Sequence, residues 1–160
     1  MPGARGATEG RMMEIIAVSA GHIGAYAALR VALWPAEGVA GHREEIERAM
    51  AAPDAGHVAF LAVAGRDVCG FAEAALRHDY VNGCTTSPVA FVEGLYVSPD
   101  WRLHGVARLL IDRVVTWARG LGCAEIASDA DVSNTDSHAM HAALGFAETE
   151  RVVFFRRSLC

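Results

Sequence analysis

One strand, turn and helix pattern in the middle of the sequence predicts a binding site for an anion. An apolar run over residues 91–97 is followed by a proline-containing turn, and Arg102, Gly105 and Ala107 open a segment with apolar residues at helical spacing. Backbone N–H groups at a helix start lack intrahelical partners, and the helix dipole adds about half a positive charge there. Because neither G-x-G-x-x-G nor Gly-Lys-Ser/Thr is present, the pattern indicates a pyrophosphate site outside the dinucleotide-binding and P-loop classes.

Covalent and metal chemistry find little support in the sequence. No Ser, His and Asp arrangement suits nucleophilic catalysis, and Cys84 lies in a turn without an evident base. The four cysteines are scattered singly, which favours reduced, structural thiols. His138 and His141 are three residues apart on a predicted helix, but no third ligand accompanies them, so no metal is expected. Glu93 is more informative, because an unpaired acid is costly to bury inside an apolar strand.

Composition limits the class of protein. A chain of 160 residues with 52% hydrophobic content fits one domain with a substantial core. The net charge of −5 disfavours nucleic acid as a partner and suits a cationic substrate. No apolar stretch is long enough to span a membrane, and no signal peptide is recognisable, so a cytoplasmic location is expected. Residues 1–12 are predicted to be a disordered extension before a single domain over residues 13–160.

The elements that must position these residues follow from hydrophobic periodicity and turn signals. We expect a strand, two helices, three strands, a helix, a strand, a helix and a closing hairpin of two strands. Their approximate ranges are 13–18, 21–33, 42–51, 57–64, 68–76, 91–97, 106–120, 124–130, 134–143, and 146–150 with 151–157.

This order and the Arg102-x-x-Gly105-x-Ala107 motif resemble the GNAT N-acetyltransferase superfamily over nearly the whole chain after residue 12. The resemblance implies an α/β fold with a central mixed, mostly antiparallel sheet, a parallel splayed strand pair and flanking helices. It also implies acetyl-CoA as co-substrate. The cofactor-binding residues that it implies are Leu95, Tyr96 and Val97 for the thioester arm, and Arg102, Leu103, His104, Gly105, Val106 and Ala107 for the pyrophosphate.

A second segment, Asn134-x-x-Ser137-x-x-x-His141, is similar to the superfamily's Asn-x-x-Ala-x-x-x-Tyr segment. There the tyrosine often protonates the departing thiolate, and His141 stands in its place here. His141 is therefore either the general acid or a partly buried packing residue. The resemblance makes Asn134 a further contact to CoA, with a helix cap as the structural alternative.

Five further blocks are similar to the smaller bacterial aminoglycoside 6'-N-acetyltransferases. The blocks are L-W-P at 33–35, R-H-D-Y-V-N-G at 77–83, T-S-P-V-A-F-V-E-G-L-Y-V at 86–97, A-S-D-A at 127–130 and L-G-F-A-E-T-E-R-V-V-F-F at 144–155. The similarity implies acetylation of the 6'-amine of kanamycin- or tobramycin-like antibiotics, antibiotic resistance, and a homodimer. The substrate-contacting residues that it implies are Trp34, Tyr80, Glu93, Asp129 and Glu150, while Glu37 stands where the family often has histidine.

Such a substrate fits the residue types. Aminoglycosides carry several ammonium groups, which call for carboxylates, and ring faces, which call for an aromatic wall. Structural alternatives exist: Asp129 at a turn, Glu150 as a solvated charge and Trp34 in the core.

For the reaction we expect direct attack in a ternary complex, with Glu93 or Asp129 orienting the amine and accepting its proton. Acetylation of another amine, such as a polyamine or a protein N-terminus, is the alternative among enzymes. If the protein is not an enzyme, the alternative is a non-catalytic protein that binds an aminoglycoside or acetyl-CoA.

Overall fold

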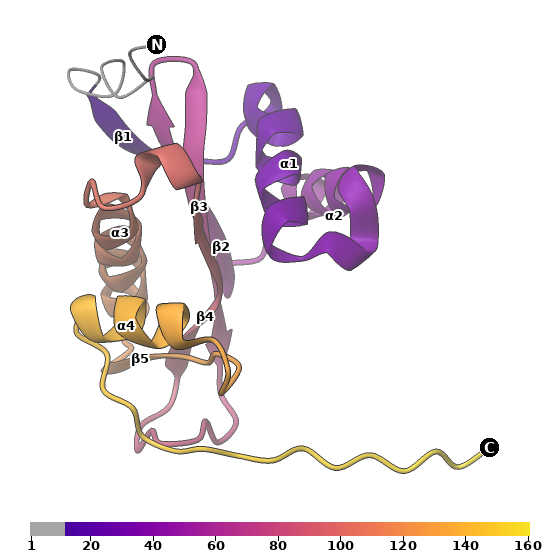
Figure 1. Ribbon diagram of the computed structural model, residues 1–160, viewed down its shortest axis with the longest axis vertical. Coiled ribbons are helices and arrows are strands. Elements are labelled where there is room, and N and C mark those ends of the chain that lie inside the picture. The colour runs from indigo at the N-terminus through magenta and orange to yellow at the C-terminus, as the bar shows by residue number, and fades with distance from the viewer. Residues whose placement is uncertain (1–11) are drawn as a thin grey trace.

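A single five-stranded sheet organises the chain, as seen in a computed structural model that describes residues 12–160 (Figure 1). The strands lie in sequence order, β1-β2-β3-β4-β5, and only the β4/β5 pair is parallel. The mixed, mostly antiparallel sheet predicted from the sequence is therefore confirmed. Apart from Met12, the predicted N-terminal extension lies outside the described residues.

The observed elements follow the predicted ones closely up to α4. They are β1 (Met13–Ala17), α1 (Ile23–Leu33), α2 (Gly38–Ala51), β2 (His57–Ala64), β3 (Asp67–Arg77), β4 (Val89–Val97), α3 (Val106–Gly120), β5 (Glu125–Ser128) and α4 (Thr135–Ala143). Short 3-10 turns at Ala20–His22, Pro35–Glu37 and Pro99–Trp101 precede α1, α2 and the turn into α3. The second helix begins at Gly38, earlier than expected, because the Pro35–Glu37 turn leads directly into it.

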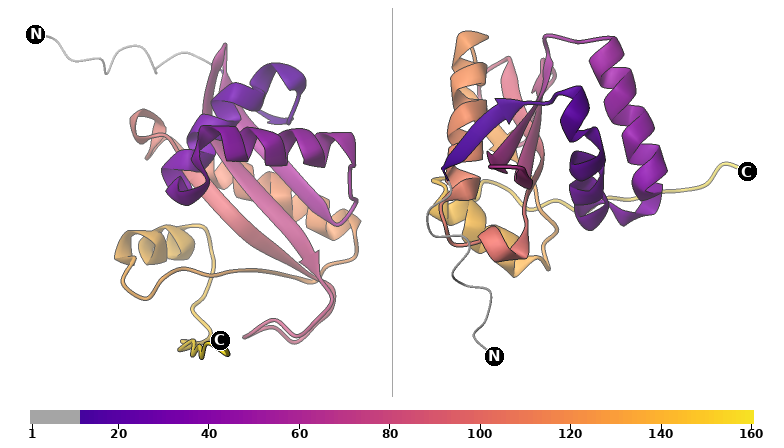
Figure 2. Two further views of the ribbon diagram at one scale, coloured as in Figure 1. Left: turned by 90° about the vertical axis from the view of Figure 1, so that its right-hand side faces the viewer. Right: turned by 90° about the horizontal axis from the view of Figure 1, so that it is seen from above.

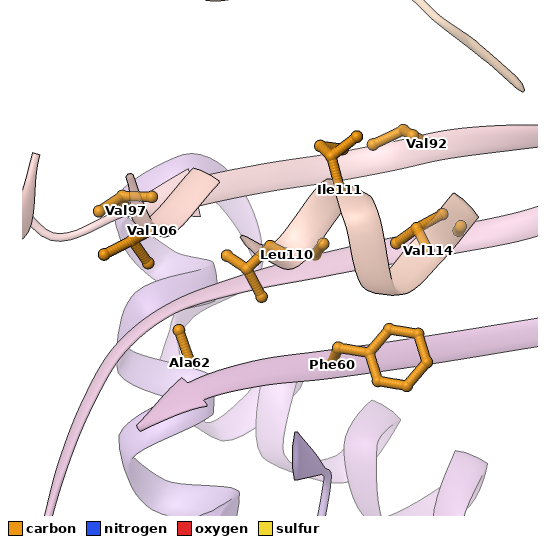
Figure 3. Close-up of a cluster of buried hydrophobic side chains, with 10 residues drawn as sticks. Phe60, Ala62, Val92, Val97, Val106, Leu110, Ile111 and Val114 are labelled. Carbon is orange, nitrogen blue, oxygen red and sulfur yellow. The ribbon is translucent and has the colours of Figure 1, made fainter. Parts of the chain in front are cut away.

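Helices cover both faces of the sheet. Figures 1 and 2 show α1 and α2 on one face and α3 on the other. On the α3 side, Val106, Leu110 and Val114 pack against Phe60 and Val92 (Figure 3). On the α1 side, Tyr26, Ala27 and Ile46 pack with Leu61, Val63 and Phe71. Successive strand residues point to opposite faces, so β2 reads as one continuous apolar run because both of its faces are buried.

The predicted closing hairpin over residues 146–157 does not form, and that prediction was wrong. No residue after Ala143 belongs to a strand, and Figure 1 shows the chain end running away from the domain. Phe154 and Phe155 are 89% and 93% exposed. Apolar residues with high β propensity predicted strands, but a two-stranded hairpin needs a surface to pack against, and among residues 12–160 this segment has none.

Candidate active site

The turn before α3 has the geometry of an anion site. Gly105 is the N-cap of α3 with a φ of 78°, and a Cβ placed there would meet no atom within 4 Å. The first intrahelical bond runs from Leu109 N–H to the Gly105 carbonyl (3.1 Å), so the preceding amides have no helical acceptor. Arg102 steadies the turn because its Nε donates to the Val97 carbonyl (2.9 Å). Room, free donors and a guanidinium together fit the phosphates of CoA.

Beside this turn, the parallel strand pair separates. The β4/β5 ladder covers only Val89–Val92 against Glu125–Ser128. Leu95, Tyr96 and Val97 continue to pair with β3, but β5 ends before reaching them. Within residues 12–160 no strand pairs with their second backbone edge, which is where the resemblance placed the thioester arm.

Glu93 marks the point where the two strands part. In the register, Val92 pairs with Ala74 and Gly94 pairs with Glu73, which makes Glu93 the extra residue of a β-bulge. A bulge redirects its side chain, and the Glu93 side chain is 40% exposed. The cost of burying an unpaired acid therefore does not apply to Glu93, because the carboxylate reaches solvent.

Arg77 at the end of β3 is the charged partner of Glu93, and the sequence analysis missed it. Arg77 Nη2 lies 3.2 Å from Glu93 Oε1, and the guanidinium stacks on the Phe91 ring at 3.6 Å. Arg77 pairs in register with Val89, so only the tertiary structure brings it to Glu93.

Three of the predicted substrate residues line one groove. Trp34, Glu37 and Glu93 face it from the α1–α2 connection and from β4. Trp34 also packs on Phe71 and on Gly94, where an added Cβ would lie 2.4 Å from Trp34 Cη2. Trp34 is therefore both a core residue and a wall of the groove.

The other predicted residues lie elsewhere. Tyr80 is 74% exposed in the loop before β4, and Asp129 is exposed directly after β5. Glu150 lies on the exposed C-terminal segment. None of these three lines the groove within this chain's described residues.

His141 and Asn134 are both engaged in local contacts. His141 Nδ1 is 2.7 Å from the Ser137 carbonyl oxygen, which identifies it as the N–H donor, and Nε2 is 2.9 Å from Ser128 Oγ at the end of β5. Its ring also packs edge-on against Phe146. Asn134 Oδ1 caps α4 by accepting from Ser137 N–H (3.1 Å), which leaves its amide NH₂ available.

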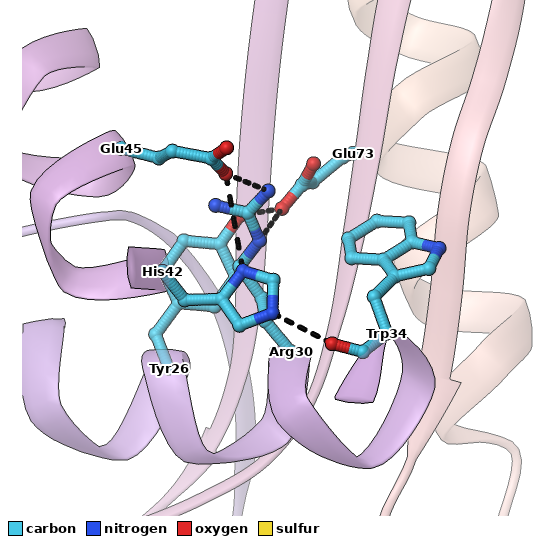
Figure 4. Close-up of polar contacts among 6 residues, drawn as sticks. All are labelled: Tyr26, Arg30, Trp34, His42, Glu45 and Glu73. Atoms are coloured by element: carbon cyan, nitrogen blue, oxygen red, sulfur yellow. Dashed lines mark hydrogen bonds and ion pairs between the residues drawn. The ribbon is translucent and has the colours of Figure 1, made fainter. Parts of the chain in front are cut away.

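A largely buried polar network along the groove was also missed (Figure 4). Tyr26 donates to Glu73, Arg30 Nε lies 3.0 Å from Glu73 Oε1, and Arg30 Nη2 lies 2.9 Å from Glu45. His42 Nε2 donates to the Trp34 carbonyl oxygen (2.8 Å). Glu73 interrupts the apolar run F-A-E-A-A-L, which is the same signal that drew attention to Glu93.

Burial dominates the electrostatics of this network. It raises the pKa of the Glu73 carboxyl, against the opposing effects of the Tyr26 hydrogen bond and the Arg30 charge. Burial, and then the charge of Glu73, also raise the pKa of the Tyr26 hydroxyl. Tyr26 is therefore the donor in the pair.

Metal and membrane features are not found in the described part of the chain. Within residues 12–160, no three His, Cys, Asp or Glu side chains come together as metal ligands. None of the helices described there has the length and apolar character needed to cross a membrane.

The fold, the splayed strands and the turn before α3 together define an acyltransferase architecture, and sequence comparison gives the same answer. The profile of the acetyltransferase (GNAT) family matches residues 26–146. The chain belongs to this family, as its motifs predicted.

The similar proteins are named more narrowly. Aminoglycoside N(6')-acetyltransferase type 1 of Serratia marcescens is 52% identical over 140 residues, covering 86% of this chain and 94% of that protein. The protein of the same name from Salmonella typhimurium is 44% identical, covering 91% and 99%. Among solved structures, AAC(6')-Iy in complex with the bisubstrate analog CoA-S-monomethyl-acetylneamine has a TM-score of 0.84 and 43% identity, covering 92% and 99%. AAC(6')-Ih from Acinetobacter baumannii has a TM-score of 0.86 and 41% identity, covering 93% and 100%.

Proposed function

We propose that this protein transfers the acetyl group of acetyl-CoA to the 6'-amine of kanamycin- or tobramycin-type aminoglycosides and thereby confers resistance. The observation that carries the proposal is the position of Glu93. This acid lines the groove beside Trp34 and Glu37, and it lies on the bulge where β4 and β5 begin to part. An amine bound in the groove would therefore meet the thioester at the splay.

Acetyl-CoA is held mainly by backbone in this proposal. The thioester arm extends along Leu95–Val97, and the pyrophosphate lies against the turn formed by residues 102–107. Arg102 adds charge, and the Asn134 amide adds a donor from α4. A cytoplasmic location is part of the proposal, because acetyl-CoA is an intracellular metabolite.

Acetyl transfer then proceeds by direct attack. The neutral 6'-amine forms a bond to the carbonyl carbon, the C–S bond breaks, and the amine proton passes to Glu93 or Asp129, directly or through water. The CoA thiolate gains a proton from solvent or from His141. His141 serves as the acid only when its Nε2 carries a proton, because its Nδ1–H is engaged by the Ser137 carbonyl.

A homodimer is also part of the proposal. Val153, Phe154 and Phe155 are 77–93% exposed on an extended segment. An exposed apolar segment of this kind and the open outer edge of β5 both favour a covering chain. In a dimer, the C-terminal segment could also bring Glu150 to the groove of the partner subunit. Sedimentation of the wild type and of a Phe154→Ser/Phe155→Ser variant tests this: the dimer predicts a shift towards monomer, and a monomeric wild type contradicts it.

The reaction itself is tested by thiol release from acetyl-CoA with purified protein. Kanamycin A is compared with its 6'-hydroxyl counterpart and with spermidine. We expect release with kanamycin A alone. Release with the 6'-hydroxyl compound would contradict the 6' position, and release only with spermidine would contradict the substrate class.

A further inference from the structure

Glu73 stands apart from the other acids near the groove, because its carboxylate is held in place through one oxygen. Tyr26 Oη–H donates to Oε1, and Arg30 Nε lies 3.0 Å from the same atom. Both partners come from α1, and Glu73 comes from the middle of β3. The side chain is therefore fixed between a helix and the sheet before any ligand binds.

The second oxygen of Glu73 is left for another partner. Oε2 has no hydrogen-bond or ion-pair partner within residues 12–160. It is also not one of the fully buried polar atoms in that range that lack a hydrogen bond. Figure 4 shows it directed away from Arg30. The side chain is 18% exposed and lines the groove on the Trp34 side as well as its continuation along α2.

The surroundings make this oxygen an acceptor for a cation. Arg30 carries one positive charge but contacts two carboxylates, those of Glu73 and Glu45. His42 lines the same groove and is 1% exposed; its Nδ1 makes no hydrogen bond within residues 12–160 and lies 3.8 Å from Glu45 Oε2. The excess carboxylate charge, and a buried ring nitrogen that makes no hydrogen bond, suit a ligand rich in ammonium and hydroxyl groups.

The register places this acceptor beside the proposed reaction site. Glu73 pairs with Gly94 across the β3/β4 ladder, and Gly94 lies under the Trp34 ring. Glu93 is the next residue on β4. A substrate stacked on Trp34 with its reacting amine at Glu93 would carry other amines within the same groove.

We propose that Glu73 is a specificity-determining residue, whose Oε2 accepts a hydrogen bond from a substrate ammonium group other than the one acetylated. The reacting amine must be neutral to attack, whereas a charge-assisted bond to Glu73 requires an amine that stays protonated. The inference rests on the proposed function, because it assumes an aminoglycoside in the groove.

Glu73→Gln tests the role closely. The glutamine carbonyl oxygen can still accept the hydrogen bond from Tyr26 and lie beside Arg30, whereas the amide NH₂ presents a donor to the groove where the wild type has an acceptor. Glu47→Gln is the matched control, since Glu47 is exposed on α2, lies 4.0 Å from Arg43 and does not line the groove. Steady-state kinetics with kanamycin A and acetyl-CoA are measured together with thermal unfolding.

We expect the KM for kanamycin A to rise roughly 10- to 100-fold in Glu73→Gln, the range expected for losing a charge-assisted hydrogen bond. The KM for acetyl-CoA and the melting temperature should stay close to those of Glu47→Gln. An unchanged kanamycin KM would overturn the role of Glu73. So would a parallel loss of acetyl-CoA affinity and melting temperature, which marks a purely structural residue.

Two further results separate the possibilities. If Glu73→Gln does not fold, Glu73→Asp keeps the charge and shortens the reach, so it should fold and still weaken kanamycin binding; unchanged binding would overturn the proposal. If the wild type neither acetylates nor binds kanamycin A, the proposed function fails and this inference fails with it. If the wild type acetylates kanamycin A and the glutamine variant has the same kanamycin KM, only the proposed role of Glu73 fails.

Discussion

The two halves of the site are built in different ways. Apart from Asn134, the proposed acetyl-CoA half lies within one continuous stretch, residues 95–107, and offers mainly backbone: the free edge of β4 and the amides before α3. The proposed substrate half gathers side chains from α1, α2, the connection between them, β3 and β4, among them Trp34, Glu73 and Glu93. Backbone recognition suits the one cofactor that a whole family shares, whereas side chains set which amine is acetylated.

The largest effect should come from the core that both halves share. Leu110 is fully buried between α3 and the sheet, so Leu110→Ala should lower the free energy of unfolding by about 2–5 kcal/mol. Leu109→Ala is the matched control on the same helix, because Leu109 is 42% exposed. Urea unfolding measures both variants. Equal losses in the two would mean that α3 does not pack as described.

A substitution at Glu93 should affect catalysis without affecting the binding of acetyl-CoA. If Glu93 accepts the amine proton, Glu93→Gln should lower kcat roughly 100-fold or more while leaving the KM for acetyl-CoA unchanged. Steady-state kinetics with both substrates varied gives the two values. Wild-type turnover in the variant would remove Glu93 from this role and leave Asp129 as the candidate base.

A substitution at Gly105 should instead affect the binding of acetyl-CoA more than that of the aminoglycoside. Its φ of 78° is costly for a β-branched residue, by about 1–2 kcal/mol, so Gly105→Val should raise the KM for acetyl-CoA about tenfold. The aminoglycoside KM should change little. Gly120→Ala, at the other end of α3 with open space around it, is the control and should behave like the wild type. A larger effect on the aminoglycoside than on acetyl-CoA would contradict the division.

The smallest effect concerns the loop that carries Tyr80. Glu125 Oε1 accepts hydrogen bonds from Thr86 and Thr85, which lower the pKa of this carboxyl. A lowered pKa means that the stabilisation is present above the ordinary glutamate value of 4.5 and is lost as pH falls through the folded pKa. The protection factors of the Thr85 and Thr86 amides, which correct for the intrinsic pH dependence of exchange, should therefore decrease when the pH is below that value. Glu125→Gln should weaken the protection of both amides at neutral pH, and equal protection in variant and wild type would contradict the anchor.

The elements that could be predicted were those whose signals are local. Strand β2 was predicted at its observed bounds, and Gly145, with a φ of 91°, follows α4 as a helix-ending glycine should. The turn before α3 could also be predicted, because a strand, a glycine and a helix start follow one another in the chain. The C-terminal hairpin failed because apolar residues at 152–155 indicate that a strand would be favourable, without saying what it would pair with.

The sequence alone determined the fold class, the strand, turn and helix of the proposed acetyl-CoA site, and the acidic, aromatic character of the proposed substrate side, since each depends on residue type or on neighbours in the chain. The tertiary structure decided which acids meet. It placed Glu93 on a bulge with Arg77, joined Glu73 to Tyr26 and Arg30, and left Tyr80, Asp129 and Glu150 outside the groove. Strand register and helix packing bring distant residues together, and neither can be predicted from any single stretch of the chain.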